Sequence, residues 1–404
     1  MKEKKKTAPA IRFPEFTTPW EQRKLGEIGS TFTGLSGKTK EDFGHGDARF
    51  VTYMNVYSNS IADLAMTERV EIDQTQNSVK YGDIFFTTSS ETPNEVGMSS
   101  VWLGNTENTY LNSFCFGYRP EVKVNPYYMA YMLRSPNVRN KLIILAQGIS
   151  RYNISKNRVM DIEVPTPDLS EQKEIGQYFF NLDHLITLHQ RKEDSLKELK
   201  KGMMQKLFSQ ELRFKDDDGH DYPTWKKRKI GDIFDYIIDK NHPNDTVLTI
   251  RQGEGTVPRS ESGIDIQFNR QSLDGYKKVM KDDFIVHLRS FQGGLEIANS
   301  DGIVSPAYTI LRSKISIDSK FYQEYFHTDE FIHHNLSFVV EGVRDGRTIN
   351  TKDLKKRFVP VPSLPEQKKI AQFLSSLDAK IDAAHRQTEA LQTIKKGFLQ
   401  KMFI

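Results

Sequence analysis

Two stretches of this 404-residue chain decide its fold. Residues Leu169–Phe208 read LSEQKEIGQYFFNLDHLITLHQRKEDSLKELKKGMMQKLF, and residues Leu364–Phe403 read LPEQKKIAQFLSSLDAKIDAAHRQTEALQTIKKGFLQKMF. They align at a constant offset of 195 residues without a gap, and 17 of the 40 positions are identical. Unrelated segments would share roughly two or three positions, because residues then match only at their background frequencies. The chain therefore contains an internal duplication.

A weaker repeat lies ahead of each matched segment. The stretch Trp20–Ile28 reads WEQRKLGEI, and it resembles WKKRKIGDI at Trp225–Ile233. The order is a variable unit of about 150 residues, a matched segment of about 40, and then the same two again. Units of this length are far longer than solenoid repeats, which indicates a two-fold duplication rather than an array.

The matched segments have the pattern of long helices. Their apolar residues recur in steps of mostly four and three, as in a coiled-coil seam. The expected seam residues are Ile175, Phe179, Leu182, Ile186, Leu196, Ile370, Leu374, Leu377, Ile381 and Leu391. A helix of about 38 residues is roughly 57 Å long and would be unstable with such a seam exposed. We expect the two helices to pair antiparallel, and the polar middle of the first, with His189 and Glu193, to pack less tightly.

Each long helix has a start signal. Asp168 with Glu171, and Ser363 with Glu366, have the spacing of a capping box. In such a box the first side chain caps the helix and the glutamate bonds back to the cap. Each segment also ends in a basic turn, which suits the negative end of the helix dipole.

The variable units alternate short strand-like runs with turn residues, which predicts mixed α/β domains of open strand order. Each also has one helix-like stretch, 126–145 in the first unit and 321–338 in the second. The expected strands are Arg49–Val56, Gly82–Thr88, Phe114–Tyr118, Val247–Gln252, Phe284–Leu288 and Tyr308–Leu311.

Composition bounds the function only loosely. The single cysteine, Cys115, excludes an internal disulfide and a cysteine-based zinc cluster, and it fits a reducing cytoplasm. The net charge of +4 permits nucleic-acid binding without requiring it. We find no apolar run of about 18 residues and expect no membrane segment. The basic first residues precede no apolar stretch, so we expect no signal peptide.

Three strings imitate catalytic motifs. Phe32–Gly37 approximates a glycine loop for S-adenosylmethionine, but its spacing is off by one. Asn125–Tyr128 lacks the second proline of the adenine-methyltransferase motif Asn-Pro-Pro-Tyr. Asp168 and Glu171 imitate a nuclease signature, but they lie too close in sequence to share a metal as strand residues do. The histidines show no metal-binding spacing. We expect neither a catalytic residue nor a metal site.

The strings that open the two helices carry a resemblance to a known family. They read PTPDLSEQKEI at Pro165–Ile175 and PVPSLPEQKKI at Pro360–Ile370. Together with the entry strings at Trp20 and Trp225 and the Lys-Lys-Gly turns, this arrangement resembles the specificity subunit of type I restriction–modification systems. The resemblance covers nearly the whole chain.

The resemblance implies an α+β fold with a pseudo-two-fold internal repeat. Two similar mixed α/β target-recognition domains, residues 1–167 and 211–362, are separated by two long antiparallel coiled-coil helices, residues 168–210 and 363–404. It implies a non-catalytic subunit that reads a bipartite, asymmetric site on double-stranded DNA. The implied partners are two methyltransferase subunits and restriction subunits, which would bind S-adenosylmethionine, ATP and Mg in place of this chain.

Base-reading side chains are expected on loops of the variable units, where Arg, Lys, Asn or Gln can present paired donors and acceptors. Arg151 and the loop of Arg344 and Arg347 hold matching repeat positions, which favours a shared role such as phosphate positioning. A surface turn or a surface salt bridge is the alternative for each residue. The predicted DNA contacts are Asn55, Ser89, Ser90, Thr92, Asn94, Arg151, Tyr152, Asn153, Arg251, Gln252, Arg289, Gln292, Arg344 and Arg347.

Two other classes of function stay open. A self-contained DNA methyltransferase or nuclease would need a cofactor loop or metal ligands, which the motifs above do not supply. A coiled-coil scaffold without DNA binding would pair with proteins only, and it predicts no salt-dependent binding to DNA.

Overall fold

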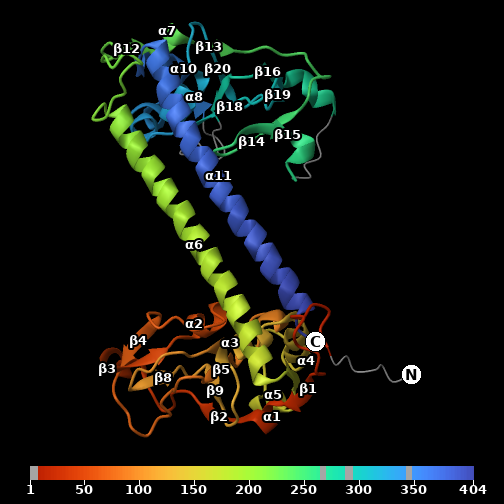
Figure 1. The fold of residues 1–404 in the computed structure, drawn as a ribbon. Helices are drawn as coiled ribbons and strands as arrows, with labels where there is room; N and C mark the ends of the chain where they lie inside the picture. Colours follow the sequence, from red (N-terminus) through yellow and green to blue (C-terminus); the bar gives the residue numbers. More distant parts are fainter. Residues whose placement is uncertain (1–7, 264–269, 287–293, 343–347) are drawn as a thin grey trace. The chain divides into compact units, whose positions relative to one another are not determined.

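The computed structural model of the chain describes residues 8–263, 270–286, 294–342 and 348–404. It divides into two compact units (Figure 1). Unit 1 contains the chain up to Arg191 together with His385–Ile404, and unit 2 contains Lys192–Ala384. Helices α6 (Leu169–Phe208) and α11 (Leu364–Lys401) each contribute residues to both units. Each unit thus combines one variable region with half of each long helix.

Unit 1 is built on a four-stranded antiparallel sheet in the order β2-β9-β5-β7. The central strand β5 is buried on both faces, because Ile84 and Phe86 face helices α3 and α4 while Phe85 packs under a second sheet, β4-β3-β8. The elements are β2 (Gly29–Thr33), β3 (Phe43–Val51), α2 (Tyr53–Ser58), β4 (Thr67–Val70), β5 (Ile84–Thr87), β6 (Ser89–Ser90), β7 (Ser99–Val101), β8 (Thr109–Leu111), β9 (Cys115–Pro120), α3 (Pro126–Met132), α4 (Pro136–Ile144) and β10 (Tyr152–Asn153).

Unit 2 repeats this plan with the order β13-β20-β17-β18. In both sheets the strand that comes first in sequence (β2 or β13) pairs with the strand that comes last (β9 or β20). That last strand also pairs with β5 or β17, which forms a hairpin with β7 or β18. The repeat and the mixed helix–strand composition are thereby confirmed. The elements are β13 (Phe234–Ile237), β14 (Leu248–Arg251), β15 (Gly255–Pro258), β16 (Lys277–Val279), β17 (Phe284–Val286), β18 (Leu295–Ile297), β19 (Gly302–Val304), β20 (Thr309–Ser313), α8 (Ser319–Phe326), α9 (Asp329–Phe331), β21 (Val340–Glu341) and β22 (Thr348–Ile349).

The entry strings form a strand followed by one helical turn in each unit. The first strand pairs antiparallel with the strand that leads into the long helix, with Arg23 opposite Val164 and Arg228 opposite Val359. The sequence repeat at Trp20 and Trp225 therefore marks where the chain enters each unit. The elements are β1 (Glu21–Lys24), α1 (Leu25–Ile28), α5 (Lys156–Met160), β11 (Glu163–Thr166), β12 (Lys226–Lys229), α7 (Ile230–Ile233), α10 (Thr351–Lys356) and β23 (Phe358–Val361).

The glutamates at the two helix starts do not close a capping box. Asp168 Oδ1 does accept from the Glu171 backbone amide at 2.9 Å. The fully buried Glu171 carboxylate, however, accepts from Arg12 Nε at 2.6 Å and from Trp20 Nε1 at 2.9 Å. In unit 2 the buried Glu366 carboxylate likewise accepts from Arg213 Nη2 at 2.9 Å. The capping-box interpretation is therefore wrong for both glutamates, which bind arginines of the segment preceding each entry strand.

The neighbouring glutamine ties each long helix to the helix that covers the sheet. Gln172 Nε2 donates to the Pro167 carbonyl at 2.9 Å, and its Oε1 accepts from the Asn125 amide at 2.9 Å. Gln367 makes the matching bonds to Pro362 and Asp318, each at 2.9 Å. Asn125 also caps α3, so the string that imitates a methyltransferase motif is a helix start.

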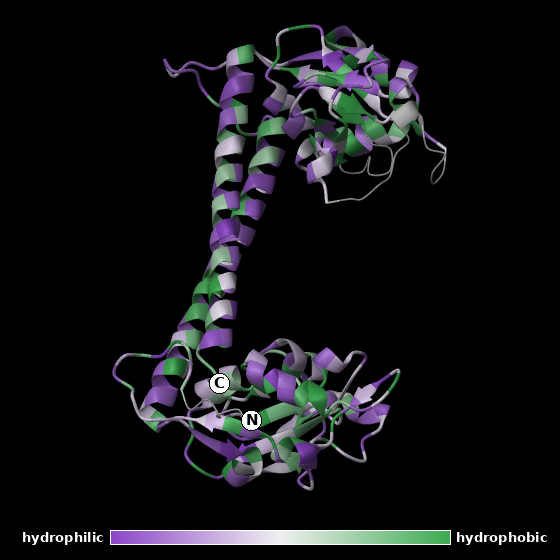
Figure 2. Ribbon diagram, turned by 90° about the vertical axis from the view of Figure 1, so that its right-hand side faces the viewer, coloured by the Kyte–Doolittle hydropathy of each residue, from purple (hydrophilic) through white to green (hydrophobic). Residues whose placement is uncertain are grey.

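The long helices run antiparallel within each unit. In unit 1 the start of α6 meets the end of α11, where the Phe179 and Phe403 rings stack with centroids 5.6 Å apart. In unit 2 the end of α6 meets the start of α11, where Phe208 shares a core with Leu374. Figure 2 shows hydrophobic and hydrophilic positions alternating along both helices. Of the expected seam residues, Leu196, Ile381 and Leu391 are half-buried, and the buried ones are Ile175, Phe179, Leu182, Ile186, Ile370, Leu374 and Leu377.

Three of the expected elements are divided or end at a helix cap in the structure. The stretch 126–145 is two helices, because Pro136 cannot continue the hydrogen-bond pattern of α3. The stretch 321–338 breaks after α8 at a second cap, Thr328, whose side chain accepts from the Phe331 amide. The strand expected to reach Val56 ends at Val51, because Thr52 caps helix α2. Among the residues that the structure describes, no helix combines the length and apolar character that crossing a bilayer requires.

Replacing Arg12 with Met should lower the free energy of unfolding by about 3 kcal/mol, because it leaves the buried Glu171 carboxylate without its cation. Urea denaturation followed by tryptophan fluorescence measures this loss. The double variant Arg12→Met/Glu171→Gln should recover part of it, since the amide carries no charge. A loss below about 1 kcal/mol in the single variant would contradict the role of this pair.

Candidate functional site

Strand pairing brings two of the predicted loops of unit 1 together. Strand β6 pairs antiparallel with β10, so that Ser89 lies opposite Asn153 and Ser90 opposite Tyr152. Arg151, Asn153, Thr92 and Asn94 are exposed around this pair, and Tyr152 is half-buried. The predicted residues that remain available to a ligand in unit 1 thus form one surface, which we call the β6–β10 surface.

Three predicted contacts in unit 1 are buried. Asn55 is fully buried in helix α2, and its Nδ2 donates to the carbonyls of Asp63 at 2.7 Å and Met66 at 2.8 Å. Ser89 and Ser90 are buried in strand β6, and Ser90 Oγ donates to Glu95 at 3.1 Å. The prediction that these side chains face DNA is therefore wrong, because all three residues are buried inside the unit.

Sequence reasoning missed two arginines that hold the segment after β6, the buried Arg139 and the half-buried Arg134. Arg139 donates to the carbonyls of Gly97 at 2.6 Å and Val96 at 2.7 Å. Arg134 donates to Ser99 at 2.6 Å and to three carbonyls at the end of α2. Burial lowers the pKa of both guanidinium groups to about 10, so both stay charged at neutral pH. Their signal in the sequence is two arginines among the apolar residues of the stretch 126–145.

Phe114 is an exposed aromatic side chain beside this surface, and sequence reasoning missed it too. The residue is 57% exposed at the tip of a turn. Its carbonyl accepts from Thr88 Oγ1 at 2.7 Å, and its amide donates to Asn112 Oδ1 at 2.9 Å. The matching turn of unit 2 has the same side-chain bond, from the Ala307 amide to Ser305 Oγ, but presents only a methyl group. One turn thus presents different side chains in the two units.

Unit 2 shows only part of its predicted set. Arg251 ends strand β14 and is exposed, and its Nη2 donates to the Glu261 carbonyl at 3.0 Å. Gln252 is exposed in the turn that follows. Arg289, Gln292, Arg344 and Arg347 lie outside the described residues.

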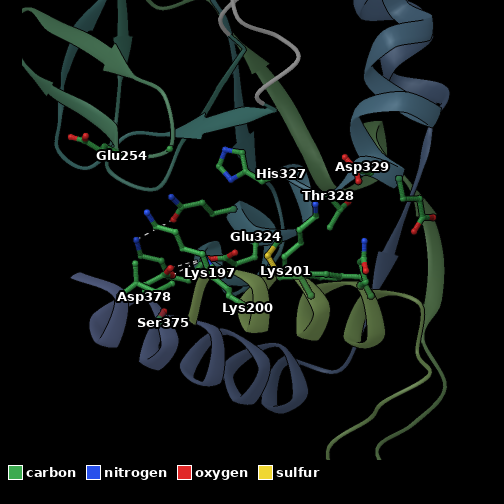
Figure 3. Close-up of a pocket in the computed structure, with 18 of the residues that line it drawn as sticks. Lys197, Lys200, Lys201, Glu254, Glu324, His327, Thr328, Asp329, Ser375 and Asp378 are labelled. Atoms are coloured by element: carbon green, nitrogen blue, oxygen red, sulfur yellow. Dashed lines mark hydrogen bonds and ion pairs between the residues drawn. The ribbon is translucent and has the colours of Figure 1, made fainter. Parts of the chain in front are cut away.

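Unit 2 also contains a cavity of about 1060 Å³ between the second half of α6, helix α8, the β14–β15 turn and the first half of α11 (Figure 3). At its centre Lys200 Nζ lies 2.8 Å from Asp378 Oδ1 and 3.0 Å from Glu324 Oε1. Burial disfavours the lysine's charge, but the two carboxylates outweigh it and raise the pKa of Lys200. Burial also raises the pKa of Glu324.

Within the described part of the chain, one group of possible metal ligands lies close together: Asp216, Asp218 and His220. They stand on a largely exposed turn, where Asp216 Oδ1 accepts from the backbone amides of Asp218 at 3.1 Å and His220 at 2.8 Å. The Asp216 carboxylate therefore stabilises the turn through these two hydrogen bonds.

Comparison with known proteins assigns both halves of the chain to one family. Residues 17–198 and 222–393 match the family model of the type I restriction modification DNA specificity domain. The chain is 25% identical over 416 residues to the MjaX specificity subunit assigned to a type I restriction enzyme of Methanocaldococcus jannaschii, covering 95% of this chain and 93% of that protein. It is 23% identical over 353 residues to the EcoKI specificity subunit of Escherichia coli K12, covering 80% of this chain and 74% of that protein.

Solved structures show the same fold. The S subunit of a type I restriction–modification system from M. genitalium superposes with a TM-score of 0.58 and 15% identity, over 98% of this chain and 99% of that one. A chain from a structure on complex assembly and conformational transition of the type I R-M system gives a TM-score of 0.57 and 18% identity, over 95% of this chain and 98% of that one.

Replacing Arg139 with Met should loosen the segment after β6, because hydrogen bonds to three backbone carbonyls are lost. Amides of residues 88–98 should then exchange with deuterium at least about tenfold faster. Hydrogen exchange read by mass spectrometry tests this, with the exposed Arg158→Met as the matched control. Equal exchange in the two variants would show that Arg139 does not hold the segment.

Proposed function

This chain belongs to the family of type I restriction modification DNA specificity domains, and from that premise we propose that it recognises a bipartite, asymmetric site on double-stranded DNA. The resemblance carried by the helix-opening strings is confirmed by the family match. As a member of this family, the chain is a non-catalytic specificity component and not an enzyme.

The observation that carries the proposal is a four-stranded sheet that is present in both units, with different side chains on the turn before its last strand. In both units an arginine near the end of the last sheet strand binds a buried aspartate, Arg119 to Asp83 at 2.6 Å and Arg312 to Asp283 at 2.7 Å. The turn before that strand presents Phe114 in one unit and Ala307 in the other. Matching four-stranded sheets whose turns present different side chains suit two half-sites of different sequence.

We assign residues 1–167 and 211–362 to target-recognition domains and residues 168–210 and 363–404 to spacer helices. Each domain would read about 3–5 base pairs across a gap of about 5–8, since one face of the duplex returns about every 10 base pairs. In unit 1 the β6–β10 surface supplies Arg151 and Asn153 for polar contacts, and Phe114 suits the methyl group of a thymine.

We assign the chemistry to partner subunits. Two methyltransferase subunits would bind S-adenosylmethionine and methylate one adenine in each half-site, and restriction subunits would use ATP and Mg. The support is the family, whose specificity members assemble with such subunits. The complex would act in the cytoplasm, where the cell's DNA is accessible.

Methylome sequencing of cells that express this chain with its methyltransferase partner should give one split motif with methyladenine in both halves. The two halves should differ in sequence, because the tips of the two units differ. Cells with the methyltransferase alone are the control. A motif without a gap, or no methylation that depends on this chain, would overturn the proposed function.

Arg151→Ala should weaken DNA binding of the assembled complex about equally for cognate and unrelated sequences, and should reduce the slope of log affinity against log salt by about 1, as loss of a phosphate contact does. Titration by fluorescence anisotropy at several salt concentrations measures both. The exposed Arg158→Ala is the matched control. An unchanged slope of log affinity against log salt would show that Arg151 does not contact DNA. If the chain were a coiled-coil scaffold without DNA binding, no salt-dependent binding to DNA would be measured for any variant.

A further inference from the structure

The large cavity of unit 2 has the charge of a site for cations. Its wall carries four lysines and six carboxylates, over an apolar floor of Met204, Phe208 and Ile381. A phosphate would meet a net negative wall, which disfavours DNA as the occupant. The acidic members are Glu254, Glu324, Asp329, Glu330, Asp378 and Asp382.

The centre of the cavity has one cation for two carboxylates. Lys200 is shared by Asp378 and Glu324, and the Glu324 side chain is only 14% exposed. Figure 3 shows these three side chains pointing toward one another between the helices, with His327 beyond them. A second cation brought by a ligand would neutralise the remaining charge of this cluster.

The matching place in unit 1 keeps the lysine–aspartate pair, as Lys395 and Asp183, but holds aromatic side chains where unit 2 has Glu324 and Ser375. Helices α3 and α8 correspond through their capping residues, Asn125 and Asp318, whose backbone amides donate to the matching glutamines of the long helices. On this alignment Glu324 is replaced by Tyr131, which is buried in a hydrophobic core. Lys395, the counterpart of Lys200, lies with its Nζ 5.5 Å from the centroid of the Tyr131 ring. On the long helix, at the offset of 195, Ser375 is replaced by Phe180. Phe180 packs on Tyr127 with ring centroids 4.8 Å apart.

We propose that this cavity is a docking site for an arginine or lysine on an amphipathic segment of the methyltransferase partner, and that unit 2 alone offers it. The apolar floor would bury the hydrophobic face of that segment, and the carboxylates would bind its cation. The inference rests on the proposed function and deepens it: two identical partner copies bind one chain with unequal affinity.

The repeat itself supplies the substitution that tests the site. Ser375→Phe introduces the side chain that stands at the matching position of unit 1, and its ring should occupy the part of the cavity next to the first half of α11. Ser376→Phe is the matched control, because Ser376 is exposed on the same helix and does not line the cavity. Native mass spectrometry and analytical ultracentrifugation of the full chain with purified methyltransferase give the stoichiometry. The thermal melting curve of each variant, read by circular dichroism, checks folding.

We expect two methyltransferase copies per wild-type chain and per Ser376→Phe chain. The Ser375→Phe chain should retain one copy, with the Kd of the other raised at least about tenfold. Equal binding of both copies by the wild-type and Ser375→Phe chains would overturn the docking site while leaving the proposed function intact. A wild-type chain that binds no methyltransferase would overturn the proposed function, and the docking site with it.

Charge-reversing substitutions at the rim of the cavity test whether the ligand is a cation or an anion. Asp382→Lys should raise the same Kd about tenfold, whereas Lys201→Glu should leave it unchanged or lower it, since the occupant is cationic. Both residues are exposed and line the cavity. The opposite pattern would indicate an anionic occupant and would contradict the proposal.

Discussion

The buried carboxylate at the start of each long helix is the constraint on which the rest of the structure depends. Glu171 and Glu366 are fully buried, and each binds an arginine that precedes its entry strand by some ten residues of chain. The next residue, a glutamine, binds the helix that covers the sheet. The glutamate and the glutamine together therefore connect the start of the long helix to the segment before the entry strand and to the helix that covers the sheet. A buried ion pair broken on one side leaves an uncompensated charge, so these contacts tolerate little change.

Two ion pairs connect the long helices, and each pair joins one copy of the repeated helix to the other. Lys200 of the first helix binds Asp378 of the second, and Lys395 of the second binds Asp183 of the first. These four residues stand at matching positions of the duplicated segment, so each pair is the pseudo-two-fold counterpart of the other. Ion pairs with partial exposure add little stability. The apolar residues of the seam bury the surface that stabilises the helix pair, and the ion pairs specify its antiparallel register.

The proposed function depends on differences between the two units, whose four-stranded sheets have equivalent strand orders. The matching turns end in Phe114 and Ala307, which changes what a ligand meets without changing the turn. The replacement of Phe180 by Ser375 and of Tyr131 by Glu324 has a larger effect. In unit 1 the two aromatic rings pack on other aromatic side chains, whereas in unit 2 the serine and the glutamate line a charged cavity. A duplicated chain can thus specialise one copy by truncating or charging a few side chains at a contact.

The sequence alone determined the duplication, the two long helices, the mixed units and the family. These features rest on local properties, namely identity at a constant offset and apolar spacing along a helix. Only the tertiary structure decided the role of Glu171, which shares its spacing with a capping box but has a partner 159 residues away. It also decided that Asn55, Ser89 and Ser90 are buried, that Arg134 and Arg139 hold a loop, and that Ser375 lines a cavity. Burial depends on which distant residues come together, and no periodicity along the chain records that.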